Sequence, residues 1–242
     1  MSVGTIFGVG LGPGDPDLMS VRADRLLRGA QHVAYFRKAG RTGQARKIVN
    51  GMIPDDAVEF PMEYPVTTEI PVSDPRYNDL LSTFYEDCTA RLKKLSIQGQ
   101  NVVVLCEGDP FFYGSFMHLY SRLRDEAPVE IVPAITGMSG AWTATGDPIT
   151  WGDDVLTVLV GTLPETVLAE RMTQTDALVV MKIGRNINKV KRALKSAGLY
   201  ERAWIVEYAQ MPNQTVTRLA EACGGITPYF SIIIVHGQGR RP

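Results

Sequence analysis

The chain has 242 residues, and its 25 Lys and Arg against 26 Asp and Glu give a formal net charge of −1. This near-neutral balance lacks the basic excess that non-specific binding to nucleic acid or to an anionic membrane needs. The composition, 45% hydrophobic and 21% charged, is that of an ordinary globular protein. No apolar run approaches the ~20 residues of a membrane span, no signal peptide is evident, and three scattered cysteines form no disulfide framework. We therefore expect a cytoplasmic protein.

Short apolar runs alternate with helical patterns in the first half of the chain. Strands are predicted at 5–9, 32–36, 57–60, 101–106 and 129–132, and helices at 20–27 and 77–95. The run 101–106 is nearly all apolar, which favours a strand covered on both faces. Ser20 is a good N-cap for the first helix. The segment 61–75 carries four prolines and is predicted to be a long surface loop.

The second half starts near residue 147 and repeats the alternation. Its predicted strands are 155–160, 177–181, 203–208 and 230–235, and its clearest helix is 187–197, followed by Gly198 as a stop signal. Alternating strands and helices are typical of the α/β class with mainly parallel sheets. We expect two domains, 1–146 and 147–242.

Three segments follow strands and carry small or acidic residues. The first, GVGLGPGDPDL at 8–18, is a glycine-rich turn, but it fails the GxGxxG dinucleotide pattern in every register. Such a turn either contacts a ligand or simply makes a tight connection. The second, LCEGDPFFYGS at 105–115, places Glu107 and Asp109 where α/β sheets bind ligands; the alternative is a turn in which Asp109 caps the next helix. In the third, PAITGMSGAWTA at 133–144, Thr136 caps a helix or touches a ligand.

Several common catalytic patterns are missing from the sequence. There is no GxxxxGK[ST] phosphate loop, no GxSxG nucleophile turn and no HExxH metal motif. The three histidines, His32, His118 and His236, are dispersed. We therefore expect no protein-bound metal.

Taken together, the three segments resemble those of the tetrapyrrole methylase family, in the same order and along nearly the whole chain. The resemblance implies two α/β/α domains, a cleft between them that holds S-adenosylmethionine, S-adenosylhomocysteine as product, and a homodimer. The cofactor-binding residues that it implies are Pro13, Glu107, Gly108, Asp109, Phe112, Thr136, Gly137, Met181, Lys182, Tyr208, Ala209 and His236.

Within this family, the chain is most similar to members that methylate C20 of precorrin-2 in cobalamin biosynthesis. The stretch CEGDPFFYGSFMHLYSRL, the proline-rich insert and TGDPITWGDDVLTVLVGTLPE at 145–165 carry this likeness. Ser115 stands where related methylases carry an arginine. Three alternatives stay open: a cobalt-loaded substrate, methylation at another position or of another target, and a binding module that uses the same cleft without turnover.

Methyl transfer from a sulfonium to an electron-rich carbon requires positioning more than acid or base catalysis, so the absence of His/Asp machinery fits this reaction. The substrate carries carboxylates, for which arginine is a suitable partner. Candidate substrate-binding residues are Arg37, Lys38, Ser115 and Arg185, although each charged one could be an ordinary surface residue. The carbon must lose a proton after attack, and Glu107, Tyr113 or solvent could accept it.

Overall fold

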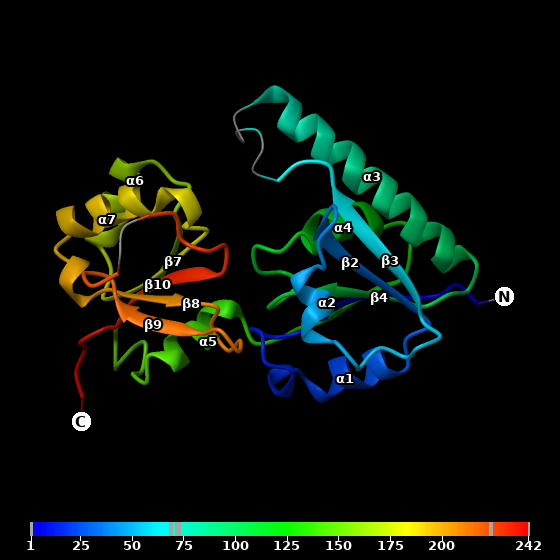
Figure 1. Cartoon of the computed structure of the whole chain (residues 1–242), viewed down its shortest axis with the longest axis horizontal. Coiled ribbons are helices and arrows are strands. Elements are labelled where there is room, and N and C mark those ends of the chain that lie inside the picture. The colour runs from blue at the N-terminus through cyan, green and yellow to red at the C-terminus, as the bar shows by residue number, and fades with distance from the viewer. Residues whose placement is uncertain (1, 68–69, 71–73, 223–224, 242) are drawn as a thin grey trace. The chain divides into compact units, whose positions relative to one another are not determined.

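Two units make up the chain, Met1–Thr136 and Gly137–Pro242, and the computed structural model describes residues 2–67, 70, 74–222 and 225–241 (Figure 1). The boundary at Thr136 precedes the expected one near residue 147. As a result, the helix α5 (Gly137–Ala144), which lies within the third predicted segment at 133–144, belongs to the second unit. Each unit is described below by itself.

The first unit is built on a sheet of five parallel strands in the order β3-β2-β4-β1-β5. In chain order they are β1 (Ile6–Gly10), β2 (His32–Lys38), β3 (Val58–Tyr64), β4 (Val102–Cys106) and β5 (Val129–Val132). All five predicted strands are therefore confirmed. The central strand β4 is buried along its whole length, as its unbroken apolar sequence predicted.

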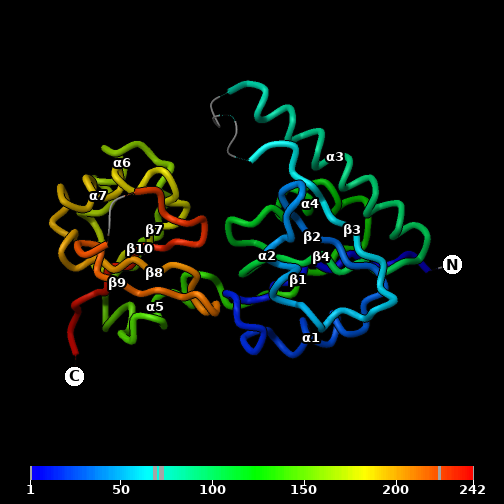
Figure 2. The backbone as a smooth tube through the Cα atoms, in the orientation of Figure 1, coloured from blue at the N-terminus to red at the C-terminus, as the bar shows by residue number. Residues whose placement is uncertain are grey.

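Helices cover both faces of this sheet (Figures 1 and 2). One hydrophobic cluster joins the sheet to α1 (Val21–Arg28) and α2 (Gln44–Ile48). A second cluster joins the other face to α3 (Pro75–Ile97) and α4 (Phe116–Leu123). A short 3-10 turn, η1 (Pro16–Leu18), precedes α1. The Ser20 hydroxyl accepts a hydrogen bond from Ala23 N at 3.1 Å, which confirms the predicted cap of α1.

The predicted loop at 61–75 is wrong at both of its ends. Strand β3 continues through Pro61 to Tyr64. A proline is tolerated there because β3 lies at the edge of the sheet, where one side of the strand has no partner to receive its N–H. At the other end, Pro75 is the first residue of α3, and Asp74 caps that helix. Part of the predicted loop, including Pro71, lies outside the described residues.

The second unit has a mixed sheet in the order β6-β7-β10-β8-β9. Its strands are β6 (Leu156–Val160), β7 (Ala177–Met181), β8 (Trp204–Glu207), β9 (Thr215–Arg218) and β10 (Ser231–Val235). The pair β6–β7 is parallel, but β7–β10, β10–β8 and β8–β9 are antiparallel. The expectation of mainly parallel sheets thus holds for the first unit and is wrong for the second. The unpredicted strand β9 follows β8 after a short connection, and short connections join antiparallel strands.

This sheet too is covered on both faces. Helices α6 (Glu165–Met172) and α7 (Ile187–Ser196) pack on one face, and α5 packs on the other. Two 3-10 turns, η2 (Gly184–Asn186) and η3 (Tyr200–Arg202), flank α7. Within the described part of the chain, no helix is both long and apolar enough to cross a membrane.

Candidate functional site

The turns that follow β1 and β4 are hydrogen-bonded to each other at the carboxyl edge of the first sheet. Leu11 N donates to Cys106 O at 2.9 Å, and Gly108 N donates to Gly12 O at 2.8 Å. Gly12 and Gly108 have φ angles of 79° and 65°, which glycine adopts without steric cost. The first and central predicted segments therefore form one surface at the edge where parallel sheets bind ligands.

Asp109 joins the central segment to the third one. Its Oδ1 accepts from Phe111 N at 2.9 Å and its Oδ2 accepts from Ala134 N at 3.0 Å. The helix α4 begins only at Phe116, so Asp109 does not cap it. Asp109 instead ties together two turns that are 25 residues apart in sequence. Its carboxylate is thus already engaged within the protein, and contact with a ligand would use its remaining lone pairs.

Two glycines of the first segment are explained by close packing. A Cβ on Gly10 would lie 2.5 Å from Ala134 Cβ and 2.8 Å from Gly108 O, so the three turns can meet only if residue 10 has no side chain. A Cβ on Gly8 would lie 2.4 Å from the ring of Phe116 on α4. Close packing therefore requires glycine at these two positions of the turn, and the role of the turn in ligand contact stays a prediction.

Glu107 lies beside Asp109 but in a different environment. Its Oε1 accepts a hydrogen bond from Ala45 N, on α2, at 3.0 Å. The side chain reaches solvent, yet the protein atoms gathered around the carboxyl desolvate it and raise its pKa, and the Ala45 bond opposes this only in part. The neighbouring Cys106 thiol is buried, and desolvation raises its pKa well above the ordinary value, so it stays protonated and unreactive.

The end of the central segment is conformationally strained. Tyr113 has a φ of 55°, a left-handed backbone that residues other than glycine rarely adopt. Its ring meets that of Phe112 edge-on with 4.8 Å between centroids, and 42% of Tyr113 is exposed. Strained backbone of this kind is common at ligand sites, where the surrounding structure holds it in place. Pro13 of the first segment, by contrast, is buried.

Ser115 belongs to a group of three hydroxyls with Tyr64 and Tyr85. Its Oγ is hydrogen-bonded to the Tyr64 hydroxyl, and the Tyr85 hydroxyl bonds to both. Burial raises the pKa of Tyr85. The predicted substrate residue Ser115 therefore forms a partly buried link between β3, α3 and the central segment. Tyr64 is not among the predicted site residues, because the surrounding prolines predicted a loop there.

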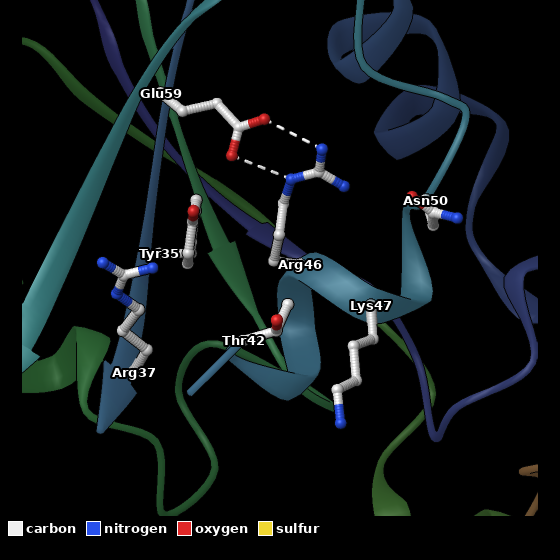
Figure 3. Close-up of a pocket in the computed structure, with 7 residues that line it drawn as sticks. All are labelled: Tyr35, Arg37, Thr42, Arg46, Lys47, Asn50 and Glu59. Carbon is white, nitrogen blue, oxygen red and sulfur yellow. Dashed lines mark hydrogen bonds and ion pairs between the residues drawn. The ribbon is translucent and has the colours of Figure 1, made fainter. Parts of the chain in front are cut away.

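A cavity of about 400 Å³ opens beside the strands β2 and β3, under α2 (Figure 3). Figure 3 shows Arg46 of α2 facing Glu59 of β3, and two hydrogen bonds of 2.8 Å join their side chains. Tyr35 and Arg37 of β2 line the same cavity. The Arg46 hydrogen bond is the largest cause of the lowered pKa of Glu59.

The predicted substrate residues Arg37 and Lys38 already have partners. The Arg37 guanidinium bonds to Glu63 Oε1 at 2.9 and 2.6 Å, and Lys38 Nζ lies 3.5 Å from Thr67 Oγ1. An incoming carboxylate would have to compete with Glu63 for Arg37.

In the second unit, the predicted residues that follow β7 and β8 gather at one edge. Both strands run antiparallel to β10, so they end at the edge where β10 begins, and Tyr208 N donates to Phe230 O at 2.7 Å. Lys182 and Tyr208 have φ angles of 52° and 53°. Gln210, at φ 60°, donates from Nε2 to Gly140 O of α5 at 3.0 Å. Met181, Lys182, Tyr208 and Ala209 thus form a second edge with unusual backbone, which the sequence pattern alone did not reveal.

Four other predicted residues lie outside the turns described so far: Thr136, Gly137, Arg185 and His236. Gly137 opens α5, and a Cβ there would lie 3.8 Å from Ile232 on β10. Thr136 is the last residue of the first unit, and Arg185 lies in η2, just after Lys182. His236 follows β10, so it lies at the opposite edge of the sheet from Lys182 and Tyr208. The structure therefore separates His236 from the other predicted cofactor residues of this unit.

No group of three or more His, Cys, Asp and Glu that could hold a metal ion is found among the described residues.

Comparison with known proteins identifies relatives along the whole chain. The family model described as tetrapyrrole (corrin/porphyrin) methylases matches residues 5–222. The precorrin-2 C(20)-methyltransferase of Sinorhizobium sp. is 46% identical over 242 residues, which is 100% of this chain and 99% of that protein. The cobalt-precorrin-2 C(20)-methyltransferase of Salmonella typhimurium is 27% identical over 97% of this chain and 97% of its own.

A solved structure supports the fold. The uroporphyrin-III C-methyl transferase from Thermus thermophilus, complexed with S-adenyl homocysteine, aligns with a TM-score of 0.67 at 23% identity. The alignment covers 96% of this chain and 97% of that one. The predicted α/β fold is thereby confirmed.

Proposed function

The chain belongs to the tetrapyrrole methylases, and we propose that it transfers a methyl group from S-adenosylmethionine to C20 of precorrin-2. The observation that carries the proposal is the 46% identity, over the full length of both chains, to a protein named precorrin-2 C(20)-methyltransferase. The intact set of three segments joined at the carboxyl edge of the first sheet favours an enzyme over a module that only binds.

The residues present fit S-adenosylmethionine. Gly108 is only partly buried and carries no side chain, so a ligand can approach the backbone of the turn after β4 closely. When bound, the cofactor supplies an activated methyl group on a sulfonium. We assign its binding to Pro13, Gly108, Asp109, Phe112 and Thr136 in the first unit. Gly137, Met181, Lys182, Tyr208 and Ala209 of the second unit are assigned to it on the family resemblance.

The electron-rich C20 carbon can attack the methyl group without first being deprotonated by a strong base. The bound cofactor would supply the methyl group to C20 and would leave as a neutral thioether that keeps the electron pair of the broken bond. C20 would then have to release its proton to an acceptor. Glu107 is our candidate for the proton acceptor, because its raised pKa brings a carboxylate closer to the basicity that proton transfer near neutrality favours. Tyr113 is the second candidate, since the strained backbone presents its side chain at the surface of the central segment.

Substrate recognition is assigned to the flank of the first unit. We propose that a peripheral carboxylate of the macrocycle replaces Glu63 at Arg37, since the guanidinium fork suits either carboxylate. Lys38, Ser115 and Arg185 remain further candidates. A homodimer is proposed on the family resemblance.

A cobalt-loaded substrate is the second candidate, favoured by the 27% identity to the cobalt-precorrin-2 enzyme. The precorrin-2 C(20)-methyltransferase is the more similar of these two relatives, at 46% identity, so we propose the metal-free substrate first.

The test is a single-turnover assay under anaerobic conditions with purified protein, S-adenosylmethionine and either precorrin-2 or cobalt-precorrin-2. Mass spectrometry should show S-adenosylhomocysteine and a precorrin one methyl group heavier, with the metal-free substrate turned over faster. Methylation at another carbon, located by NMR of the labelled methyl group, would reject the C20 assignment while leaving the methyltransferase intact. Glu107→Gln should bind S-adenosylmethionine normally and turn over more slowly.

A further inference from the structure

The second unit contains a pocket that the proposed reaction does not use. It has a volume of about 380 Å³ and is lined by Trp151, Trp204, Arg202, Arg218 and Arg241, together with the segment around His236. Trp204 begins β8 and His236 follows the end of β10, so the pocket lies at the edge opposite to Lys182 and Tyr208. Its volume falls within the range of about 300–1,000 Å³ that is common for small-molecule sites.

The walls of this pocket are fixed by hydrogen bonds. Asp154 Oδ2 accepts from Trp151 N at 2.8 Å and from Gly239 N at 3.2 Å. A Cβ on Gly237 or Gly239 would lie 2.0 or 2.3 Å from the Asp154 carboxylate, so glycine is needed at both positions for the segment to pass. Arg202 donates to His236 O at 2.6 Å. These bonds hold the segment that follows β10 against the loop that carries Trp151.

Both indole rings of the pocket carry an arginine on one face. The Arg218 guanidinium lies 3.9 Å from the ring centroid of Trp204, its partner across the β8–β9 pair, and Arg241 lies 4.4 Å from that of Trp151. Stacking uses the flat face of a guanidinium and leaves the N–H groups at its rim available to an anion. Of these groups, one on Arg218 reaches Arg202 O at 3.4 Å.

The net charge of the lining favours an anionic ligand. Within the described part of the chain, no carboxylate forms an ion pair with Arg218 or Arg241. Asp147 and Glu201 also line the pocket, so the three arginines leave one excess positive charge. The net positive charge attracts an anion, and the paired N–H donors at a guanidinium rim match the two oxygens of a carboxylate.

We propose that this pocket binds a flat ring compound that bears one carboxylate. The carboxylate bonds to the rims of the Arg218 and Arg241 guanidiniums, and the ring lies against the aromatic and guanidinium surfaces. The proposal does not depend on the methyltransferase assignment, because its residues lie apart from the edge assigned to the cofactor.

The experiment is a calorimetric titration of the whole protein with quinoline-2-carboxylate as the probe. We expect saturable binding of one probe per chain, accompanied by a change in tryptophan fluorescence. Arg218→Gln and Arg241→Gln should each weaken it about ten- to hundredfold, the effect of losing a charge-assisted hydrogen bond. Arg171→Gln, an exposed arginine of the same unit outside the pocket, is the matched control and should bind as the wild type does.

Three further probes test the chemistry: quinoline without the carboxylate, cyclohexanecarboxylate without the flat ring, and inorganic phosphate. Each should bind much more weakly than quinoline-2-carboxylate. The proposal is overturned if no saturable binding occurs, if any of these probes binds as well, or if both arginine variants retain wild-type affinity. Arg241 is exposed, so its variant remains a valid test even where Arg218→Gln fails to fold. Unchanged S-adenosylmethionine affinity in Arg241→Gln shows that the cofactor site is intact.

Discussion

The two sheets present their candidate edges in different ways. In the first unit, all strands are parallel, and three turns are tied together by backbone hydrogen bonds, by Asp109 and by the close approach at Gly10. In the second unit, the sheet is mixed, and the corresponding residues carry left-handed backbone at Lys182, Tyr208 and Gln210. The first edge depends on close packing and the second on local strain.

The two edges are therefore sensitive to different substitutions. A packed junction fails when volume is added or a hydrogen bond is removed, whereas a strained turn can be relaxed by glycine without loss of packing. All three tryptophans, Trp142, Trp151 and Trp204, lie in the second unit, so their fluorescence follows that unit alone. Hydrogen exchange read by mass spectrometry follows the two units separately.

The most disruptive change should be Gly10→Val. The new side chain would meet Ala134 Cβ and Gly108 O at once, and we expect the free energy of unfolding of the first unit to fall by about 3 kcal/mol or more. Gly29→Ala is the control, because a Cβ there meets its nearest atom at an ordinary 3.5 Å. Urea unfolding followed by hydrogen exchange measures both. Equal stability of the two variants would contradict the packed junction.

Asp109→Ala should have the next largest effect. Two backbone donors, Phe111 N and Ala134 N, lose their acceptor, which should cost about 1–3 kcal/mol of stability. S-adenosylmethionine binding, measured by calorimetry, should weaken as the central and third segments separate. Asp56→Ala, at an exposed position, serves as the control. Wild-type affinity in Asp109→Ala would mean that the junction is not part of the cofactor site.

A smaller effect is expected from pH at the Arg46–Glu59 pair. Arg46 lowers the pKa of Glu59 in the fold, so the pair stabilises the first unit at pH values above the ordinary 4.5 of this carboxyl. That contribution is lost as the pH falls through the lowered pKa. Because the pair is partly exposed, we expect about 1 kcal/mol between wild type and Glu59→Gln at pH 7. The difference should shrink in acid, and a constant difference from pH 7 to about 3 would contradict the assignment.

Lys182→Gly should produce the smallest change, and it should have the opposite sign. Glycine adopts a φ of 52° without strain, so the second unit should gain up to about 1 kcal/mol, reduced by the greater freedom of glycine in the unfolded chain. Lys189→Gly, inside α7, should instead lose about 1 kcal/mol. Tryptophan fluorescence during urea unfolding measures both changes. A loss of stability in Lys182→Gly would show that the lysine side chain, and not the backbone strain, dominates there.

Much of the fold followed from local patterns. The apolar run of β4, the cap at Ser20 and the stop at Gly198 fixed their elements because each rests on neighbouring residues. Strand β9 was missed because its sequence, TVTR, is short and has only one apolar residue. The direction of β10 depends on pairing with strands distant in sequence. Because β10 runs antiparallel to β7 and β8, His236 at its end lies at the edge opposite to Lys182 and Tyr208.

By itself, the sequence determined which residues follow the strands, and its three motifs identified the family, because motif order is a property of the chain. Only the tertiary structure decided what those residues do locally. It showed that Asp109 bridges two turns, that Gly10 makes room for Ala134, and that Arg37 is already paired with Glu63. These roles are set by contacts between segments far apart in the chain, and no local pattern encodes such distances.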